Sequence, residues 1–283
     1  MQLKKKNSDI TMVYEWKDKV VLITGAAAGI GACVVRIIVK EGVKHVAILD
    51  VDAKSGEALQ NELNSKYGPL VKFYRCDATN EEQLLGIFDT VKNEQGYIDV
   101  VVNNAGIMND SMKLYKTEIN LNVTATVTGT LKAYELMRKD KGGRGGTVIN
   151  IASVAAITQN PMLPIYFATK AAVLQFSNCI GLKEYYEKSQ VRVLVMCFGA
   201  TDTPLLSMQK LGSFDEEAEA NFMNILVAYP MQPPEAAAEG LVEAFRRGES
   251  GSTWLSNNSR PVEDISHLVN QAYGQYYDKV FGN

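Results

Sequence analysis

Histidine is scarce in this chain of 283 residues, which contains only His45 and His267, and its four cysteines are far apart with no CxxC pair. Two distant histidines are too few for a zinc site or a histidine-based catalytic dyad. Scattered cysteines indicate free thiols in a reducing compartment rather than a disulfide framework. We therefore expect no metal ion, and a chemistry that depends on other side chains.

The chain also lacks an excess of positive charge and a long apolar segment. It has 29 basic and 32 acidic residues, a formal charge of −3, which makes nucleic acid an unexpected partner. The most apolar stretch, residues 20–39, is interrupted by three glycines and Arg36, and the first sixteen residues lack the apolar core of a signal peptide. We expect a cytoplasmic protein without a membrane span.

Short β-branched runs alternate with helix-length segments along most of the sequence. The expected strands are residues 20–24, 46–50, 71–75, 100–103, 147–151, 191–197 and 253–256. Several of these runs are continuously apolar, which is typical of strands buried on both faces. The expected helices are residues 31–41, 53–65, 80–95, 116–139, 165–187 and 234–247. This alternation predicts an α/β fold with one doubly wound parallel sheet.

No linker or change of composition divides residues 18–256, so we expect one domain. Residues 1–17 are expected to be a flexible extension. Residues 257–283 form a tyrosine-rich tail that could be helical and dock on the body or on a second subunit. Residues 200–230 are expected to be a small helical lid inserted between the sixth and seventh strands. A capping box of Ser213 and Glu216 would start the lid helix, followed by an apolar stripe: Phe214, Ala218, Phe222, Ile225 and Leu226.

A glycine-rich turn follows the first expected strand. Its residues are Gly25, Ala28, Gly29, Ile30 and Gly31 within the segment TGAAAGIG. Glycines here would let the backbone approach a pyrophosphate, and the free N–H groups of the following helix would bind its oxygens. A merely tight strand–helix turn is the alternative.

An acidic residue ends the second strand. Asp50 comes 19 residues after Gly31, near the spacing at which a carboxylate meets the adenosine ribose of a dinucleotide. It would repel a 2′-phosphate, and neither Ala28 nor Val51 offers a cation for one, so the pattern favours NAD over NADP. The alternative makes Asp50 a helix cap without a ligand contact.

Further polar turns follow the third and fourth strands. Cys76, Asp77 and Ala78 would lie near the adenine, although Asp77 could equally be a helix N-cap. The second turn contains Asn104, Ala105 and Gly106. Ligands of open α/β sheets bind outside these carboxyl strand ends, so the sequence predicts dinucleotide binding.

Three residues near the fifth strand form a candidate catalytic set. Ser153 ends the strand, Tyr166 follows thirteen residues later, and Lys170 lies four positions further, on the same face of a helix. A lysine ammonium and an oxidised nicotinamide nearby would lower the pKa of a phenol that is otherwise near 10. A tyrosine–lysine pair at this spacing occurs by chance, so the conjunction with the nucleotide turn carries the argument.

The set TGAAAGIG, CDAT, NNAG, Ser153 and YFATK resembles the short-chain dehydrogenase/reductase family over residues 18–256. The resemblance implies a Rossmann-type sheet of about seven strands and hydride transfer between a carbonyl or alcohol and a nicotinamide cofactor. It implies that Tyr166 is the general acid/base, Lys170 the pKa depressor and ribose ligand, and Ser153 the substrate orienter. Asn122 matches the family asparagine that holds a water in a proton relay to Lys170.

The resemblance extends to details. It implies that Gly199, Thr201 and Thr203 lie at the nicotinamide, and that helices 116–139 and 165–187 pair in a homodimer or homotetramer. The segments before Ser153 and after the lid look like the branch of insect-type alcohol dehydrogenases and 15-hydroxyprostaglandin dehydrogenases. One departure is Phe198, where the family usually has proline.

The expected substrate is an apolar, secondary alcohol. Candidate apolar residues of its pocket are Ile157, Met162, Leu163, Leu205, Leu206, Met208, Leu211, Phe214, Phe222 and Met223. Packing of the lid on the body is an equally good explanation of several of them. Two other functions stay open: a nucleotide-binding relative without activity, and a carbonyl reductase using NADPH, which Asp50 disfavours.

Overall fold

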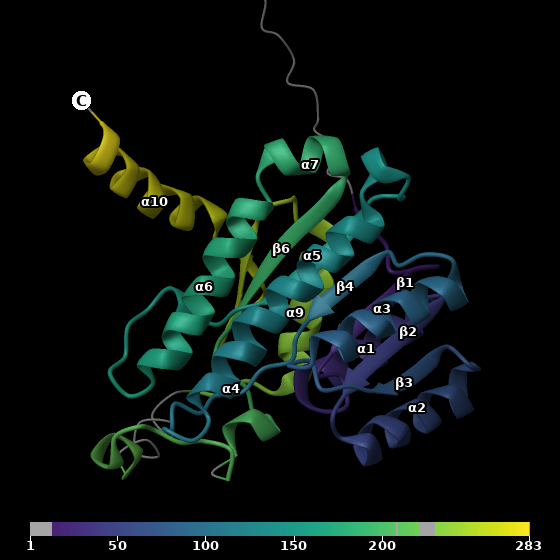
Figure 1. Ribbon diagram of the computed structural model, residues 1–283, viewed down its shortest axis with the longest axis horizontal. Coiled ribbons are helices and arrows are strands. Elements are labelled where there is room, and N and C mark those ends of the chain that lie inside the picture. Colours follow the sequence, from purple (N-terminus) through teal and green to yellow (C-terminus); the bar gives the residue numbers. More distant parts are fainter. Residues whose placement is uncertain (1–12, 208, 221–229, 283) are drawn as a thin grey trace, which may run out of the picture.

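The computed structural model describes residues 13–207, 209–220 and 230–282, and it has one sheet with helices on both faces (Figure 1). The strand order is β3-β2-β1-β4-β5-β6-β7-β8. Neighbouring strands from β3 to β7 are parallel, as predicted. The strands are β1 (Val20–Thr24), β2 (His45–Asp50), β3 (Val71–Arg75), β4 (Val100–Asn103), β5 (Gly146–Ile151), β6 (Val191–Phe198), β7 (Thr253–Ser256) and β8 (Glu263–Asp264).

The sequence predicted about seven strands, and the eighth is a short addition at one edge. β8 pairs antiparallel with β7 through only two residue pairs. Its two residues, Glu263 and Asp264, are exposed and carry no apolar signal that would have predicted a strand.

The main helices are α1 (Gly29–Lys40), α2 (Ala53–Tyr67), α3 (Glu81–Gln95), α4 (Tyr115–Ile119), α5 (Thr126–Met137), α6 (Pro164–Ile180), α7 (Lys183–Ser189), α9 (Pro234–Arg247) and α10 (Ser266–Phe281). Alternate residues of β1 show which of these helices cover each face of the sheet. Val21 and Ile23 belong to a buried cluster with α1, α2 and α9, whereas Val20 and Leu22 belong to a cluster with α3 and α5. The continuous apolar runs therefore reflect strands buried on both sides, as the sequence predicted.

Two long predicted helices are interrupted. The segment predicted as 116–139 consists of α4, a π-helical turn over Asn120–Ala125, and α5. The segment predicted as 165–187 is broken between α6 and α7 at Gly181, where an added Cβ would lie 2.6 Å from the Gly251 backbone. The second interruption coincides with close packing against Gly251, and a helical period in the sequence reveals neither interruption.

The lid differs from its predicted start. Asp215, rather than Ser213, caps the helical residues 216–220, because its Oδ1 accepts from Ala218 N–H at 2.8 Å. Ser213 is instead tied to the body through a hydrogen bond from its hydroxyl to Met162 O at 3.3 Å. The stripe residues Phe222, Ile225 and Leu226 lie outside the described residues.

The tyrosine-rich tail forms α10, which extends away from the body in Figure 1. Val269 is its one buried residue, and Tyr276, Tyr277, Val280 and Phe281 are exposed. Docking of this tail on a second subunit stays a prediction. Within the described residues, no helix is long and apolar enough to cross a membrane.

The packed body starts before the predicted boundary at residue 18. Trp16 is 1% exposed, and its ring centroid lies 4.0 Å from that of Phe245 on α9. Tyr14 packs against the same cluster. The last residues of the expected extension therefore belong to the core. The polar residues before Trp16 gave no sign of this, but burial of a large aromatic side chain outweighs their polarity.

Replacing Trp16 with alanine should lower the free energy of unfolding by about 3–5 kcal/mol, the usual range for deleting a buried large aromatic side chain. The measurement is equilibrium unfolding in urea, with Val13→Ala as the control because Val13 is 64% exposed. Equal urea midpoints for the Trp16 variant and the wild type would place residues 13–17 outside the packed body.

Candidate active site

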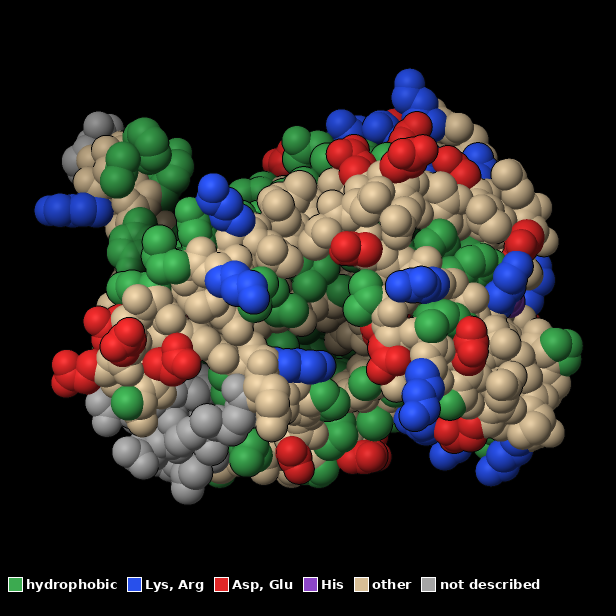
Figure 2. Space-filling model, turned by 60° about the horizontal axis from the view of Figure 1, so that its bottom comes forward, with side chains coloured by type: hydrophobic (Ala, Val, Ile, Leu, Met, Phe, Trp, Pro, Cys, Tyr) green, Lys and Arg blue, Asp and Glu red, His purple; other side chains and the backbone are tan. Residues whose placement is uncertain are grey.

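A cleft of about 710 Å³ lies at the carboxyl ends of the parallel strands. The face turned forward in Figure 2 is hollowed near its centre. The walls of the cleft come from the turns after β1, β2, β3 and β4, from the ends of β5 and β6, and from the lid segment. Its size suits a dinucleotide reaching toward a small substrate.

Most of the predicted site residues line this cleft together. They are Gly25, Ala28, Gly29, Ile30, Asp50, Val51, Cys76, Asp77, Ala78, Asn104, Ala105, Gly106, Ser153, Tyr166, Lys170, Gly199, Thr201 and Thr203. Gly31 and Asn122 lie directly behind the wall, where they contact lining residues. Residues far apart in sequence thus meet at one sheet edge.

The glycine turn has the geometry of a phosphate cradle. Gly25 and Gly29 have φ angles of 63° and 56°, and residues that carry a Cβ rarely adopt such positive values. An added Cβ at Gly31 would lie 2.6 Å from the Gly25 carbonyl oxygen. No side chain caps the N-terminus of α1, so its first N–H groups and its dipole are available to an anion.

Asn104 and Asp50 hold this turn in place. Asn104 Nδ2 donates to the carbonyl oxygens of Thr24 and Gly25, at 3.0 and 2.8 Å. Asp50 Oδ2 accepts from Ala27 N–H at 3.0 Å. Asp50 is therefore linked to the turn and does not cap α2, whose N-cap is Asp52.

The helix-cap alternative for Asp77 is also wrong. Asn80 caps α3, with its side chain accepting from Gln83 N–H. Asp77 Oδ1 accepts instead from the N–H and the hydroxyl of Thr79, at 2.9 and 2.7 Å. Asp77 lies in the cleft wall, so contact with the adenine stays the prediction for its carboxylate.

Tyr166 and Lys170 lie on one face of α6, and both are almost entirely buried, at 7% and 5% exposed. The Lys170 ammonium lies 5.6 Å from the centre of the Tyr166 ring and donates to Ile151 O at 3.1 Å. Burial lowers the pKa of Lys170 to about 8, an effect that Glu118 opposes when it is ionised.

The lowering of the Tyr166 pKa was predicted for a phenol beside both Lys170 and an oxidised nicotinamide, and for that state it stays a prediction. Burial raises the pKa of Tyr166 to about 12, a hydrogen bond with Ser153 opposes the rise, and a negative charge on Glu118, when it is ionised, adds to it. Lys170 is not among the groups that lower it. Loss of hydration therefore outweighs the nearby lysine, so any lowering requires a further positive charge.

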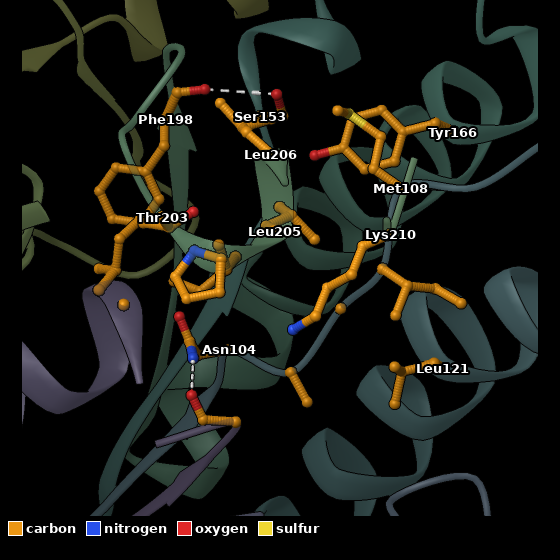
Figure 3. Close-up of a pocket in the computed structure, with 18 of the residues that line it drawn as sticks. Asn104, Met108, Leu121, Ser153, Tyr166, Phe198, Thr203, Leu205, Leu206 and Lys210 are labelled. Atoms are coloured by element: carbon orange, nitrogen blue, oxygen red, sulfur yellow. Dashed lines mark hydrogen bonds between the residues drawn. The ribbon is translucent and has the colours of Figure 1, made fainter. Parts of the chain in front are cut away.

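Ser153 lies opposite Tyr166, and Figure 3 shows both hydroxyl-bearing side chains at the same end of the cleft. The Ser153 hydroxyl donates to Phe198 O at 3.3 Å and accepts from Ala155 N–H at 3.1 Å. Phe198 stands where the family resemblance predicts proline, and its backbone carbonyl is the group that holds the serine hydroxyl. Its ring also forms part of the cleft wall.

Asn122 lies in the π-helical turn and is 1% exposed. Its Oδ1 accepts from Ile107 N–H at 2.9 Å, and its Nδ2 donates to Thr169 Oγ1 at 3.1 Å. An added Cβ at Gly106 would lie 3.1 Å from Asn122 Oδ1 and 3.5 Å from Lys170 Nζ. Glycine at 106 thus leaves space between the asparagine and the lysine, in agreement with a small polar relay.

The two residues predicted beside Gly199 have different surroundings. Thr203 packs against the glycine turn, since an added Cβ at Gly29 would lie 3.3 Å from Thr203 Cβ. Thr201 donates its hydroxyl to Gly199 O at 2.9 Å and accepts from Gln232 at 3.2 Å. Thr201 is therefore held by the protein, whereas the Thr203 hydroxyl group has no such fixed partner among the described residues.

The substrate end of the cleft is apolar. Met162, Leu163, Leu205 and Leu206 line it as predicted, whereas Ile157, Leu211 and Phe214 do not, and Phe214 is 50% exposed. Met208, Phe222 and Met223 lie outside the described residues. Sequence reasoning did not place Met108, Leu121 or Lys210 in the cleft wall, among others, because their segments carry no motif.

Comparison with known proteins agrees with this geometry. The family model described as short chain dehydrogenase matches residues 19–212. The chain belongs to the short-chain dehydrogenase family. This confirms the resemblance that its motifs predicted.

The similar curated proteins come from the expected branch. The chain is 32% identical over 229 residues to 15-hydroxyprostaglandin dehydrogenase [NAD(+)] of Rattus norvegicus, covering 79% of this chain and 85% of the relative. It is 35% identical over 204 residues to Alcohol dehydrogenase 1 of Ceratitis capitata, covering 71% and 76%.

A similar solved structure is a 3-ketoacyl-(acyl-carrier-protein) reductase from Brucella melitensis complexed with NADH. It has a TM-score of 0.73 at 23% identity, covering 87% of this chain and all of the other. At this identity the likeness supports the fold.

Proposed function

We propose that this protein is an NAD-dependent oxidoreductase that transfers a hydride between an apolar secondary alcohol and NAD, with Tyr166 as the general base. The observation that carries the proposal is the buried Ser153–Tyr166–Lys170 arrangement beside a glycine turn that an anion would fit. The relatives named for NAD(+) and for alcohol dehydrogenase activity support the same reading.

The residues present fit the cofactor. The uncapped start of α1 would hold the pyrophosphate, Asp50 the adenosine ribose, and Lys170 with Tyr166 the nicotinamide ribose. When bound, the nicotinamide supplies the hydride acceptor and a positive charge near the phenol.

The protein side chains would handle the proton. Ser153 would hold the substrate oxygen beside the Tyr166 hydroxyl, and the phenolate would take the O–H proton as the carbinol C–H leaves as hydride. The products are then a ketone, the reduced cofactor and a protonated Tyr166. Lys170 and Asn122 would return that proton toward solvent, which restores the base.

The apolar cleft wall supports the substrate class. Met108, Leu121, Leu205 and Leu206 surround the space beyond Tyr166. These four side chains offer no hydrogen bond to a substrate, and Lys210 is a charged side chain beside them in the cleft wall. Reduction of the corresponding carbonyl is the reverse reaction at the same site.

Replacing Tyr166 with phenylalanine should remove at least about 99% of kcat while NADH binding is kept, because acid–base catalysis contributes roughly 10²–10⁴-fold. The assay follows NADH absorbance with a series of apolar secondary alcohols. Tyr134→Phe is the matched control, since Tyr134 is a buried tyrosine outside the cleft wall. A Tyr166 variant that keeps more than about a tenth of kcat would refute its role as base. An inactive wild type would favour the nucleotide-binding alternative.

Asp50 should determine the choice of cofactor. A hydrogen bond to a charged group contributes about 1.5–3 kcal/mol, and repulsion of a 2′-phosphate about 1–4 kcal/mol. Since each 1.4 kcal/mol is tenfold, kcat/KM should favour NAD over NADP by at least about a hundredfold. Asp50→Ala should lose most of this preference.

Because Asp50 also accepts from Ala27 N–H, Asp50→Asn is the informative companion variant. It keeps an acceptor for the turn and removes the negative charge, so it should relieve the repulsion of NADP with less damage to the turn. A cofactor ratio unchanged in both variants would mean that the ribose lies elsewhere.

We infer further that α5 and α6 pair across a two-fold axis, as predicted for a homodimer or homotetramer. Leu131 on α5 is 50% exposed, and the solvent face of α6 bears small residues, Ala168, Ala171 and Ala172. Such faces allow close helix approach. Light scattering at micromolar concentration should give a mass of at least twice 31.1 kDa, whereas a stable monomer would contradict the pairing.

A further inference from the structure

Two carboxyl groups are completely buried behind the helix that carries Tyr166. Asp110 lies in the loop after β4 and Glu118 lies on α4, and both are 0% exposed. Burial of two acidic side chains without a lysine or arginine bound to either is costly, so their hydrogen bonds need an explanation.

Asp110 caps α6 from outside the helix. Its Oδ2 accepts from Ile165 N–H at 2.6 Å, and its Oδ1 accepts from Tyr166 N–H at 3.0 Å. Leu163, the N-cap residue of α6, provides no side-chain cap. Asp110 therefore satisfies two free N–H groups at the start of the helix, one of them the backbone of Tyr166 itself.

Glu118 lies against Asp110 and shares its surroundings. Its Oε1 accepts from Asn109 N–H at 3.1 Å, whereas no N–H or O–H group of the described residues reaches its buried Oε2. The Asp110 carboxyl is the neighbouring side chain that interacts with the Glu118 carboxyl. A proton held between the two groups satisfies both, because two adjacent buried carboxylates repel each other.

The proton belongs to Glu118. Burial, together with the charge of Asp110, raises the pKa of Glu118 to about 8. Burial also raises the pKa of Asp110, but the two N–H groups and the dipole of α6 oppose that rise and stabilise its anion.

The same loop holds the lid segment. Asp110 N–H donates to Gly212 O at 2.9 Å, and Asn109 Nδ2 donates to Lys210 O at 2.8 Å. Lys210 belongs to the cleft wall. Residues 109–110 thus connect the start of the Tyr166 helix with the segment that covers the substrate.

We propose that Glu118 is a positioning residue for the dehydrogenase reaction: as a carboxylic acid it donates a hydrogen bond to Asp110 and keeps that carboxylate in place as the cap of α6, which fixes Tyr166 opposite Ser153. The inference rests on the proposed function, because the position of Tyr166 matters only if it is the base. Glu118 itself does not touch the cleft.

The titratable groups that act on Glu118 are Asp110 and, from α6, Tyr166 and Lys170. The Lys170 charge favours ionisation of Glu118, and Asp110 opposes it. An ionised Glu118 would repel the capping carboxylate, and its negative charge would contribute to the raised pKa of Tyr166. The neutral acid is therefore the form that supports catalysis.

Two variants separate positioning from general disruption. Glu118→Gln keeps an acceptor for Asn109 N–H and a donor for Asp110, whereas Glu118→Leu removes both. At pH 7 we expect kcat of Glu118→Gln within about threefold of wild type and kcat of Glu118→Leu at least tenfold lower, since small misplacements of a catalytic group are costly. The NADH dissociation constant, measured by fluorescence, should change less than threefold in both. Equal kcat losses in the two variants would overturn the positioning role.

A second measurement needs no activity. A carboxyl group whose folded pKa is near 8 and whose unfolded pKa is near 4.5 binds more protons when folded, so wild-type stability falls as pH rises between these values. Glutamine does not titrate. The difference between the urea midpoint of Glu118→Gln and that of wild type should therefore shift in favour of the variant as the pH rises from 5 to 8.

If the difference between the two urea midpoints stays constant from pH 5 to pH 8, the claim that Glu118 is protonated is overturned. This test holds even if Glu118→Leu does not fold. If the wild type oxidises no alcohol, the proposed function and the positioning role both fail. Even then, a midpoint difference that shifts with pH in favour of Glu118→Gln would support the proton on Glu118.

Discussion

Removal of the Tyr166 hydroxyl and the Lys170 ammonium from water is the constraint on which the chemistry of this site depends. Burial moves the pKa values of the two groups apart, from 10.0 to about 12 for the phenol and from 10.5 to about 8 for the amine. Each shift disfavours the charged form. A phenolate in this place is therefore stable only when another positive charge comes close to it.

The sheet provides this burial. Parallel strands covered on both faces end at one edge, and α6 packs its buried face against them, so Tyr166 and Lys170 point into the fold instead of into solvent. Rigid hydrogen bonds then fix the neighbours of the phenol. Phe198 O holds Ser153, Ile151 O holds Lys170, and Asp110 holds the start of α6. Such fixed partners reduce the reorganisation that a reaction would otherwise require.

The sequence predicted the parallel sheet and the gathering of its site residues well, because both depend on local patterns. Continuous apolar runs reveal doubly buried strands, and the turn and the tyrosine–lysine spacing are short motifs. The family membership confirms the resemblance that those motifs carried.

The features that were missed depend on tertiary contacts. The break at Gly181 follows from its contact with the Gly251 backbone, and the π-helical turn around Asn122 has no composition signal. Asp110 and Glu118 read as ordinary acidic residues in the sequence, yet both are buried. The rise in the Tyr166 pKa that burial causes was also missed, since sequence spacing gives proximity to Lys170 and not the loss of hydration.

The account is tested most directly by titrating the Tyr166 phenol itself. Ultraviolet difference spectra of tyrosinate, with the spectra of Tyr166→Phe subtracted, report its ionisation with and without saturating NAD. The account predicts that Tyr166 ionises near pH 12 in the protein alone and at least two pH units lower with NAD bound. An equal pKa in the two states would contradict the claim that a bound positive charge turns this buried phenol into a base.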